Sequence, residues 1–212
     1  MKFGVIGLGR FGHDVATLLT ENGMEVLAVD DNESIVASIS DNVTQAICIH
    51  ITDEVSLINI GMHEMDTVIV AMGENVAQSI LITALLKKRL DIKKVITRAV
   101  SEIHKEILLL VGADQVILPE KEVGIHLADK LSSPFLDLWR LSPHFSIAEL
   151  RAPKKFIGKK IKDLQLFETN QVHCIGIKKD EEIVSIAADY TISPNDQLII
   201  SGQTDHLENI LD

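Results

Sequence analysis

The chain has 212 residues, enough for one large domain or two small ones, and 46% of them are hydrophobic, so a substantial core can form. Its formal charge of −11 argues against a general nucleic-acid binder, because such proteins present a basic face to phosphates. No uncharged apolar run approaches the roughly 18 residues that span a bilayer. The two cysteines, Cys48 and Cys174, lie in apolar runs and predict reduced core residues of a cytoplasmic protein.

The first 30 residues carry the pattern around which the chain is organised. An apolar strand leads into Gly7-x-Gly9-x-x-Gly12, a helical stripe follows, and a second apolar strand ends at Asp30. In this arrangement the first glycine allows a tight turn, the second lets backbone N–H groups approach a phosphate, and the third lets the helix pack on the strand. Asp30 stands 18 residues after Gly12, close to the roughly 20 typical of the acid that binds ribose hydroxyls. The pattern predicts a nucleotide-binding βαβ unit.

Strands and helices continue to alternate as far as residue 118. The expected strands are 2–6, 24–29, 44–49, 66–71, 94–98 and 115–118, and the expected helices are 11–21, 33–39, 53–58, 76–89 and 102–110. This alternation predicts an α/β fold with a Rossmann-type doubly wound parallel sheet.

The pattern changes after Pro119. A helical stripe starts at Glu120, is interrupted at residues 132–134 and resumes over residues 136–141. Short strands are then expected at 144–150, 172–177, 182–186 and 197–201, with helices near 159–164 and 204–211. We therefore expect a nucleotide-binding domain with its helical connector over residues 1–141 and a small C-terminal α+β domain over residues 142–212.

Candidate site residues follow from the rule that ligands of this fold lie across the carboxyl ends of the strands. They are Gly7, Gly9, Arg10, Phe11 and Gly12 of the glycine loop, Asp30, Asp31 and Asn32, His50 and Ile51, Ala71, Met72 and Gly73, Arg98 and Ala99, His104, and Glu120.

Three of these candidates have more than one interpretation. Arg10 could pair with phosphate oxygens or be a solvated residue at a helix start. His104 could reach the nucleotide or point into solvent. Glu120 could be an ordinary carboxylate at a helix N-terminus or a ligand of Mg²⁺ or Ca²⁺ beside the phosphates.

The sequence does not single out one nucleotide, and it leaves more than one function for the pocket. Asp30 disfavours a 2′-phosphate and so argues against NADP, whereas NAD, ADP and ATP remain open. The only tyrosine, Tyr190, is followed by Pro194 where a short-chain dehydrogenase has lysine, and no nucleophile elbow or P-loop lysine is present. These features predict a pocket that senses a nucleotide. An NAD-dependent oxidoreductase and a free-standing sensor with a soluble partner are the alternatives.

Several stretches resemble the RCK domains of the KtrA/TrkA regulators of bacterial potassium uptake. They are Val5-Ile-Gly-Leu-Gly-Arg-Phe-Gly12, Glu25-Val-Leu-Ala-Val-Asp30, Val68-Ile-Val-Ala-Met-Gly73 and Gly112-Ala-Asp-Gln-Val-Ile-Leu-Pro-Glu-Lys121. Phe145-Ser-Ile-Ala-Glu-Leu150 resembles the start of the family's C-terminal subdomain. The single Rossmann copy is similar to KtrA rather than TrkA, which has two in tandem.

The resemblance implies a non-enzymatic cytosolic subunit that assembles through dimers into an octameric ring beneath a membrane potassium translocator of the KtrB/TrkH kind. ATP or ADP, or alternatively NAD or NADH, would bind the Rossmann pocket and bias the shape of the ring, and thereby the pore. By position, Arg10 would contact the terminal phosphate across the dimer, Asp30 would hold the ribose, and Glu120 would help to bind a divalent cation. His50, Ala71, Gly73, Arg98 and His104 would line the site, and the helix after Glu120 would cross to a partner subunit.

Overall fold

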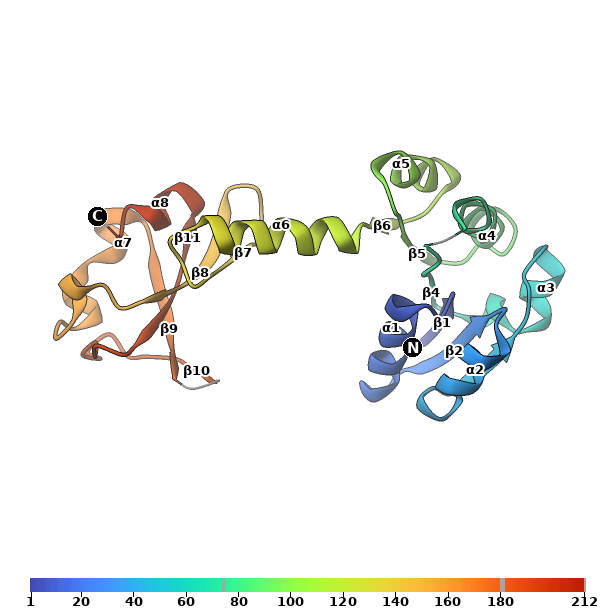
Figure 1. The fold of residues 1–212 in the computed structure, drawn as a ribbon, viewed down its shortest axis with the longest axis horizontal. Helices are drawn as coiled ribbons and strands as arrows, with labels where there is room; N and C mark the ends of the chain where they lie inside the picture. The colour runs from blue at the N-terminus through green and yellow to red at the C-terminus, as the bar shows by residue number, and fades with distance from the viewer. Residues whose placement is uncertain (74, 180–181, 212) are drawn as a thin grey trace. The chain divides into compact units, whose positions relative to one another are not determined.

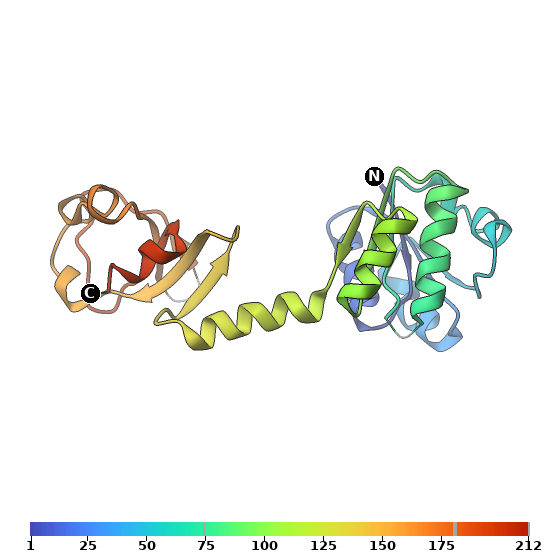
Figure 2. The ribbon, with the colours of Figure 1, turned by 90° about the horizontal axis from the view of Figure 1, so that it is seen from above.

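The computed structural model describes residues 1–73, 75–179 and 182–211. Contacts divide the chain into two compact units, Met1–Glu120 and Lys121–Asp212, and each unit is described by itself (Figures 1 and 2). Among the described residues, no helix is long and apolar enough to cross a membrane.

The N-terminal unit is a parallel sheet with helices on its faces. Its strands are β1 (Lys2–Ile6), β2 (Glu25–Asp30), β3 (Gln45–Cys48), β4 (Thr67–Val70), β5 (Lys94–Arg98) and β6 (Gln115–Ile117), in the order β3-β2-β1-β4-β5-β6. Its helices are α1 (Arg10–Glu21), α2 (Glu33–Ile39), α3 (Glu54–Asn59), α4 (Val76–Lys88) and α5 (Glu102–Val111). The strand order reverses between β1 and β4, which confirms the predicted doubly wound fold.

Both faces of this sheet are buried. Val5 of β1 packs in one core cluster with Ala28 and Ile69, and these two are its register partners on β2 and β4. The next residue, Ile6, packs in the cluster on the opposite face. Because successive strand residues point to opposite faces, continuous apolar runs are needed on strands that are covered on both sides.

Side-chain caps start α2 and α3, two helices of this unit. The Asn32 side chain accepts hydrogen bonds from the backbone N–H groups of Ser34 and Ile35 at the start of α2. Asp53 accepts one from the N–H of Ser56 at the start of α3. These local bonds fix where each helix begins, and therefore how the preceding loop turns at the sheet edge.

The C-terminal unit is an antiparallel sheet with short helices. Its strands are β7 (Asp137–Arg140), β8 (Phe145–Arg151), β9 (His173–Lys179), β10 (Glu182–Val184) and β11 (Gln197–Gln203), in the order β10-β9-β11-β8-β7. The helix α6 (Pro119–Ser132) precedes it, and α7 (Leu166–Asn170) and α8 (Thr204–Glu208) complete it. Two short 3₁₀ turns, η3 (Lys154–Phe156) and η4 (Ile161–Leu164), lie between β8 and α7.

Two expectations for this unit were wrong. The helical stripe expected to resume over residues 136–141 is the strand β7, whose Leu138 pairs with Ala148 of β8 and is buried. The apolar residues there do not share one buried face, since Leu141 is 64% exposed. The helix expected near residues 159–164 is only the single 3₁₀ turn η4. The helix α7 was not predicted from the sequence.

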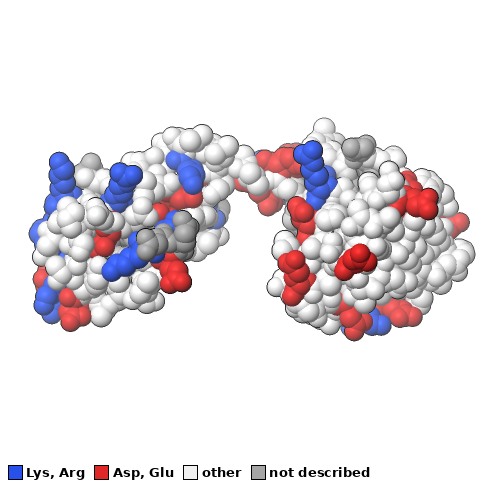
Figure 3. Space-filling view, turned by 60° about the horizontal axis from the view of Figure 1, so that its bottom comes forward, with Lys and Arg blue, Asp and Glu red and all other residues white. Residues whose placement is uncertain are grey.

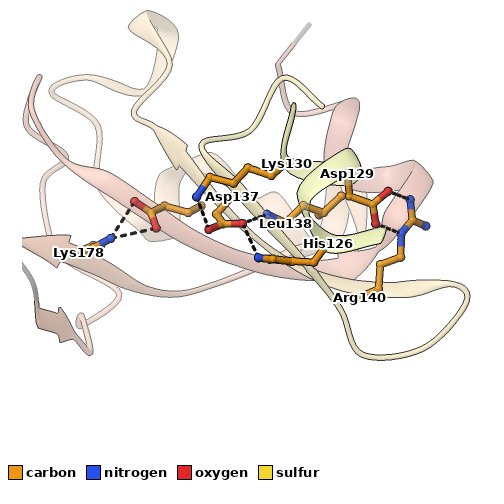
Figure 4. A network of polar contacts seen from close by, with 8 residues as sticks. His126, Asp129, Lys130, Asp137, Leu138, Arg140 and Lys178 are labelled. Carbon is orange, nitrogen blue, oxygen red and sulfur yellow. Dashed lines mark hydrogen bonds and ion pairs between the residues drawn. The ribbon is translucent and has the colours of Figure 1, made fainter. Parts of the chain in front are cut away.

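Ion pairs attach the end of α6 to β7 (Figure 4). Arg140 donates two hydrogen bonds to Asp129, which hold the pKa of that carboxyl below its usual range. Asp137 accepts from Lys130 at 2.8 Å and lies 3.4 Å from Nε2 of His126. These contacts explain why residues 121–141 group with the C-terminal unit, although the domain boundary at residues 141 and 142 stays a prediction.

Both cysteines are free thiols. Cys174 is partly buried, and burial raises its pKa to about 11. Cys48 is exposed at the end of β3, so the expectation that it is a core residue was wrong.

Candidate functional site

A cavity of about 730 Å³ lies at the carboxyl ends of the parallel strands of the N-terminal unit. Its volume is within the range of small-molecule sites. Most of the residues predicted from the sequence line it, namely Gly7, Gly9, Arg10, Phe11, Asp30, Asp31, Asn32, Ala71, Met72, Gly73, Arg98 and Glu120. Segments that are far apart in the chain therefore meet at one edge of the sheet, as the fold requires.

The glycine loop forms one wall of this cavity. Gly7 has a φ of +90°, which strongly favours glycine, and its N–H donates to the carbonyl of Val29 at 2.8 Å. A Cβ on Gly12 would overlap the carbonyl oxygen of Gly7, so the third glycine lets α1 pack on β1. A Cβ on Gly9 would meet nothing within 4 Å, and α1 begins with no side-chain cap on its first turn. The loop thus presents open space in front of free helical N–H groups, which favour an anionic ligand.

Asp30 holds this loop in place. Its Oδ2 accepts the N–H of Leu8 at 2.7 Å, and its Oδ1 accepts the N–H of Asn32 at 2.9 Å. The carboxylate thereby joins the glycine loop to the turn after β2. Each oxygen keeps further acceptor capacity, so Asp30 can also receive ribose hydroxyls.

Arg98 and Glu120 form an ion pair on the cavity wall. Nη2 of Arg98 contacts Oε1 of Glu120, and the Arg98 side chain is 20% exposed. The backbone N–H of Glu120 and the Arg98 guanidinium hold the pKa of the Glu120 carboxyl below its usual range. A Cβ on Gly73 would collide with the Arg98 guanidinium, so glycine there makes room for it.

No group of three or more His, Cys, Asp or Glu side chains that could hold a metal is found in the part of the chain that the structure describes. The cation role of Glu120 stays a prediction.

Five predicted residues do not line the cavity. Gly12 lies beneath the loop, Ile51 and Ala99 are buried, and His50 pairs at 3.1 Å with Asp31. His104 is 2% exposed, although the sequence left it as either a wall residue or a solvated one. Its Nδ1 accepts the N–H of Val100 at 3.3 Å, and burial lowers its pKa. Its Nε2 is buried and has no hydrogen-bond partner among the residues that the structure describes.

Among the described residues, three that line the wall were not predicted, namely Ile35, Asn75 and Gln78. Asn75 caps α4 by accepting the N–H of Gln78 at 3.1 Å, and the Gln78 side chain donates to the carbonyl of Ile51 at 3.1 Å. An asparagine directly before a helical stripe is a recognised cap signal, so Asn75 could have been found from the sequence.

Together the fold and this cavity define a Rossmann-type nucleotide-binding domain followed by a small α+β domain. Residues 3–119 match the TrkA-N domain and residues 146–212 match the TrkA-C domain. The chain belongs to the family of proteins with these RCK-type domains, which confirms the resemblance seen in its motifs.

Relatives cover nearly the whole chain. It is 38% identical over 203 residues to Ktr system potassium uptake protein A of Bacillus subtilis (strain 168), which spans 95% of this chain and 91% of that protein. It is 36% identical to Ktr system potassium uptake protein C of that organism, again over 95% of this chain and 91% of that protein. With Ktr system potassium uptake protein A of Vibrio alginolyticus it shares 35% over 213 residues, 99% of this chain and 96% of that one.

Solved structures agree on the fold. The RCK domain of GsuK superposes with a TM-score of 0.69 at 15% identity, covering 99% of this chain and 46% of that one. The NAD(P)-binding domain of an exopolyphosphatase-related protein from Archaeoglobus fulgidus gives a TM-score of 0.54 at 26% identity, covering 61% of this chain and 96% of that one.

Proposed function

We propose that this protein is a non-enzymatic, nucleotide-sensing regulatory subunit of a potassium-uptake system. The observation that supports it most is the cavity of about 730 Å³, which joins the glycine loop, Asp30 and two arginines. It occurs in a chain that is similar over 95% of its length to proteins named as Ktr potassium uptake proteins. The similarity supports a role in potassium uptake, and the cavity supports a nucleotide as the signal.

The residues fit an adenine nucleotide, ATP or ADP, with NAD or NADH as the alternative. The open space at Gly9 and the free N–H groups of α1 would receive phosphates, and Arg10 would add a guanidinium there. Asp30 would receive the ribose hydroxyls while keeping its bonds to the loop. When bound, ATP would bring one more phosphate, and therefore more negative charge, to this site than ADP.

The Arg98–Glu120 pair offers a way to convert that charge into a change of shape. A phosphate that reaches Arg98 competes with Glu120 for the guanidinium, and Mg²⁺ or Ca²⁺ would favour a released Glu120. Glu120 is the second residue of α6, so its position is tied to the start of that helix. Two ligands with different charge would thus favour different arrangements at this point, which is the requirement for a population shift.

The subunit would act in the cytoplasm, at the inner face of the membrane, through a translocator of the KtrB/TrkH kind. We further propose that dimers assemble into an octameric ring, as the family resemblance implies. A free-standing sensor with a soluble partner is the rival for this part of the proposal. Affinity purification of the tagged chain from its native cells, followed by mass spectrometry, should recover a membrane potassium translocator. Recovery of soluble partners alone would favour the rival.

Calorimetry of the purified chain with ATP, ADP, NAD and NADH, each with and without Mg²⁺, tests the binding proposal. Binding of at least one adenine nucleotide is expected, and binding of none would refute the proposal. An NAD-dependent oxidoreductase would instead show cofactor turnover with some substrate.

The variant Arg10→Ala tests the phosphate contact. Loss of a charge-assisted bidentate contact weakens binding by about tenfold to a hundredfold. We expect this loss for ATP and a smaller one for ADP, so that the two affinities converge. The control is Arg89→Ala, which removes an exposed arginine outside the cavity and should change neither affinity. A preserved difference between ATP and ADP in Arg10→Ala would show that Arg10 does not read the terminal phosphate.

A further inference from the structure

One segment of the C-terminal unit has a charge opposite to that of the rest of the chain. Residues 151–162 contain six Lys and Arg residues and no Asp or Glu, namely Arg151, Lys154, Lys155, Lys159, Lys160 and Lys162. The whole chain has a formal charge of −11 and this segment contributes +6, so the other 200 residues carry −17. Figure 3 shows Lys and Arg side chains gathered over the C-terminal unit, whereas the same view of the N-terminal unit shows mainly Asp and Glu.

All six basic side chains are exposed. None of them forms an ion pair with any residue that the structure describes, and only Lys155 has a further contact, with its Nζ 5.7 Å from the ring centroid of Phe156. Exposed lysines normally alternate with carboxylates, so a run of six uncompensated charges needs an explanation outside this fold.

The segment is nevertheless well anchored. Phe156 is buried in the core of the C-terminal unit, and Ile161 packs against the same core. Two backbone hydrogen bonds join it to the strand-like stretch at Ile192, from Gly158 N–H to the Ile192 carbonyl at 2.8 Å and from Ile192 N–H to the Lys159 carbonyl at 3.0 Å. The backbone that carries the lysines is therefore preformed, which lowers the entropic penalty of binding a partner.

We infer that this basic segment docks on a bilayer surface that contains anionic phospholipids. Five of its six cations are lysines, which act as hydrated point charges beside lipid headgroups. The exposed Ile157 stands in the sequence between the pairs 154–155 and 159–160, where it can enter the membrane interface. The only aromatic residue of the segment, Phe156, is buried, so no side chain there can stack on an unpaired base. These features favour a lipid surface over a nucleic acid.

The negative charge of the other residues does not prevent this docking. The Debye length is about 8 Å at physiological ionic strength, so only charges close to the membrane are felt. The proposal draws on the proposed function only for placing the protein beside the inner leaflet, and the following test needs neither nucleotide nor translocator.

The test is co-sedimentation of the full chain with phosphatidylcholine vesicles that contain or lack phosphatidylglycerol. Each lysine near an anionic surface strengthens partition by about fivefold. The double variant Lys159→Gln/Lys160→Gln should therefore bind the anionic vesicles about 25-fold more weakly, and Lys154→Gln/Lys155→Gln should lose a similar factor. Binding should also disappear near 1 M salt, where the Debye length falls to about 3 Å.

The matched control is Lys93→Gln/Lys94→Gln, which removes an exposed lysine pair from the N-terminal unit and should leave vesicle binding unchanged. The proposal is overturned if the wild type ignores phosphatidylglycerol, if the control loses as much as the other variants, or if a DNA duplex is bound and vesicles are not. Calorimetry with ATP on the same variants separates the two proposals. Retained nucleotide binding without vesicle binding would refute only the lipid surface.

Discussion

Replacing Asp30 by asparagine tests how the glycine loop is held. The carboxylate accepts the N–H of Leu8 at 2.7 Å and the N–H of Asn32 at 2.9 Å. Leu8 is 2% exposed, so water cannot replace its lost partner. A hydrogen bond to a charged group contributes about 1.5–3 kcal/mol. Asparagine keeps one acceptor oxygen and places an NH₂ group against the other donor, so we expect a loss of about 2 kcal/mol in the free energy of unfolding. Alanine loses both bonds, and we expect about 4 kcal/mol.

Urea unfolding followed by two probes is the assay. Most helical residues lie in the N-terminal unit and dominate far-UV circular dichroism, whereas the only Trp and Tyr, Trp139 and Tyr190, report on the C-terminal unit. The Asp30 variants should lower the midpoint seen by circular dichroism. The control is Asp31→Asn. Within the described part of the chain Asp31 pairs with an exposed histidine alone, so this change should alter stability by less than about 0.5 kcal/mol. Equal midpoints for Asp30→Asn and Asp31→Asn would refute the loop-holding role.

Three further predictions concern packing, pH and the ion pair of the cavity. Gly12→Ala should reduce the free energy of unfolding by about 3 kcal/mol in urea titrations, whereas Gly124→Ala, which meets nothing within 4 Å in α6, should raise it by about 0.5–1 kcal/mol. Burial lowers the pKa of His104 in the folded state, so the unfolded chain takes up the proton first and stability is lost as the pH falls below about 6.5. Thermal unfolding of His104→Gln should therefore decline less between pH 7 and pH 5 than that of the wild type, and equal declines would contradict this. Glu120→Gln frees Arg98, so calorimetry without Mg²⁺ should show ATP binding about fivefold more tightly. An unchanged Mg²⁺ dependence in that variant would exclude Glu120 as a cation ligand.

Features that depend on neighbouring residues were predictable from the sequence. The cap at Asn32 forms with residues two and three positions away, and β4 is a run of four buried residues, as expected of a strand covered on both faces. The glycine spacing likewise fixed the loop, because the turn at Gly7 and the packing at Gly12 are consequences of a missing Cβ. The fold class and most of the cavity wall follow from these local signals.

Features that depend on distant partners were not predictable. Leu138 is in a strand because Ala148 pairs with it across the hairpin, and its own neighbours suit a helix equally well. His104 is buried by packing that its helical position does not reveal. Asp30 was expected to bind a ribose, but its bond to Leu8 joins residues 22 positions apart. A pattern of residue types can suggest that a carboxylate has a function without showing that it also supports the backbone.

The proposed ribose contact of Asp30, added to its bonds to the loop, would make nucleotide binding and loop stability one equilibrium. A ligand that binds only when the glycine loop is folded stabilises the folded state by RT ln(1 + [L]/Kd), which is about 2.7 kcal/mol at a hundredfold excess over Kd. This gain is similar in size to the loss of stability expected for Asp30→Asn. Across the cavity, Glu120 stands at the start of α6, a fully described helix in which no residue is buried. Val123, Leu127 and Leu131 of α6 are more than half exposed, which is costly unless another surface covers them. The proposed partner subunit would supply that surface. A nucleotide that draws Arg98 away from Glu120 would then act on the start of α6, a helix whose exposed apolar residues the proposed partner subunit would cover.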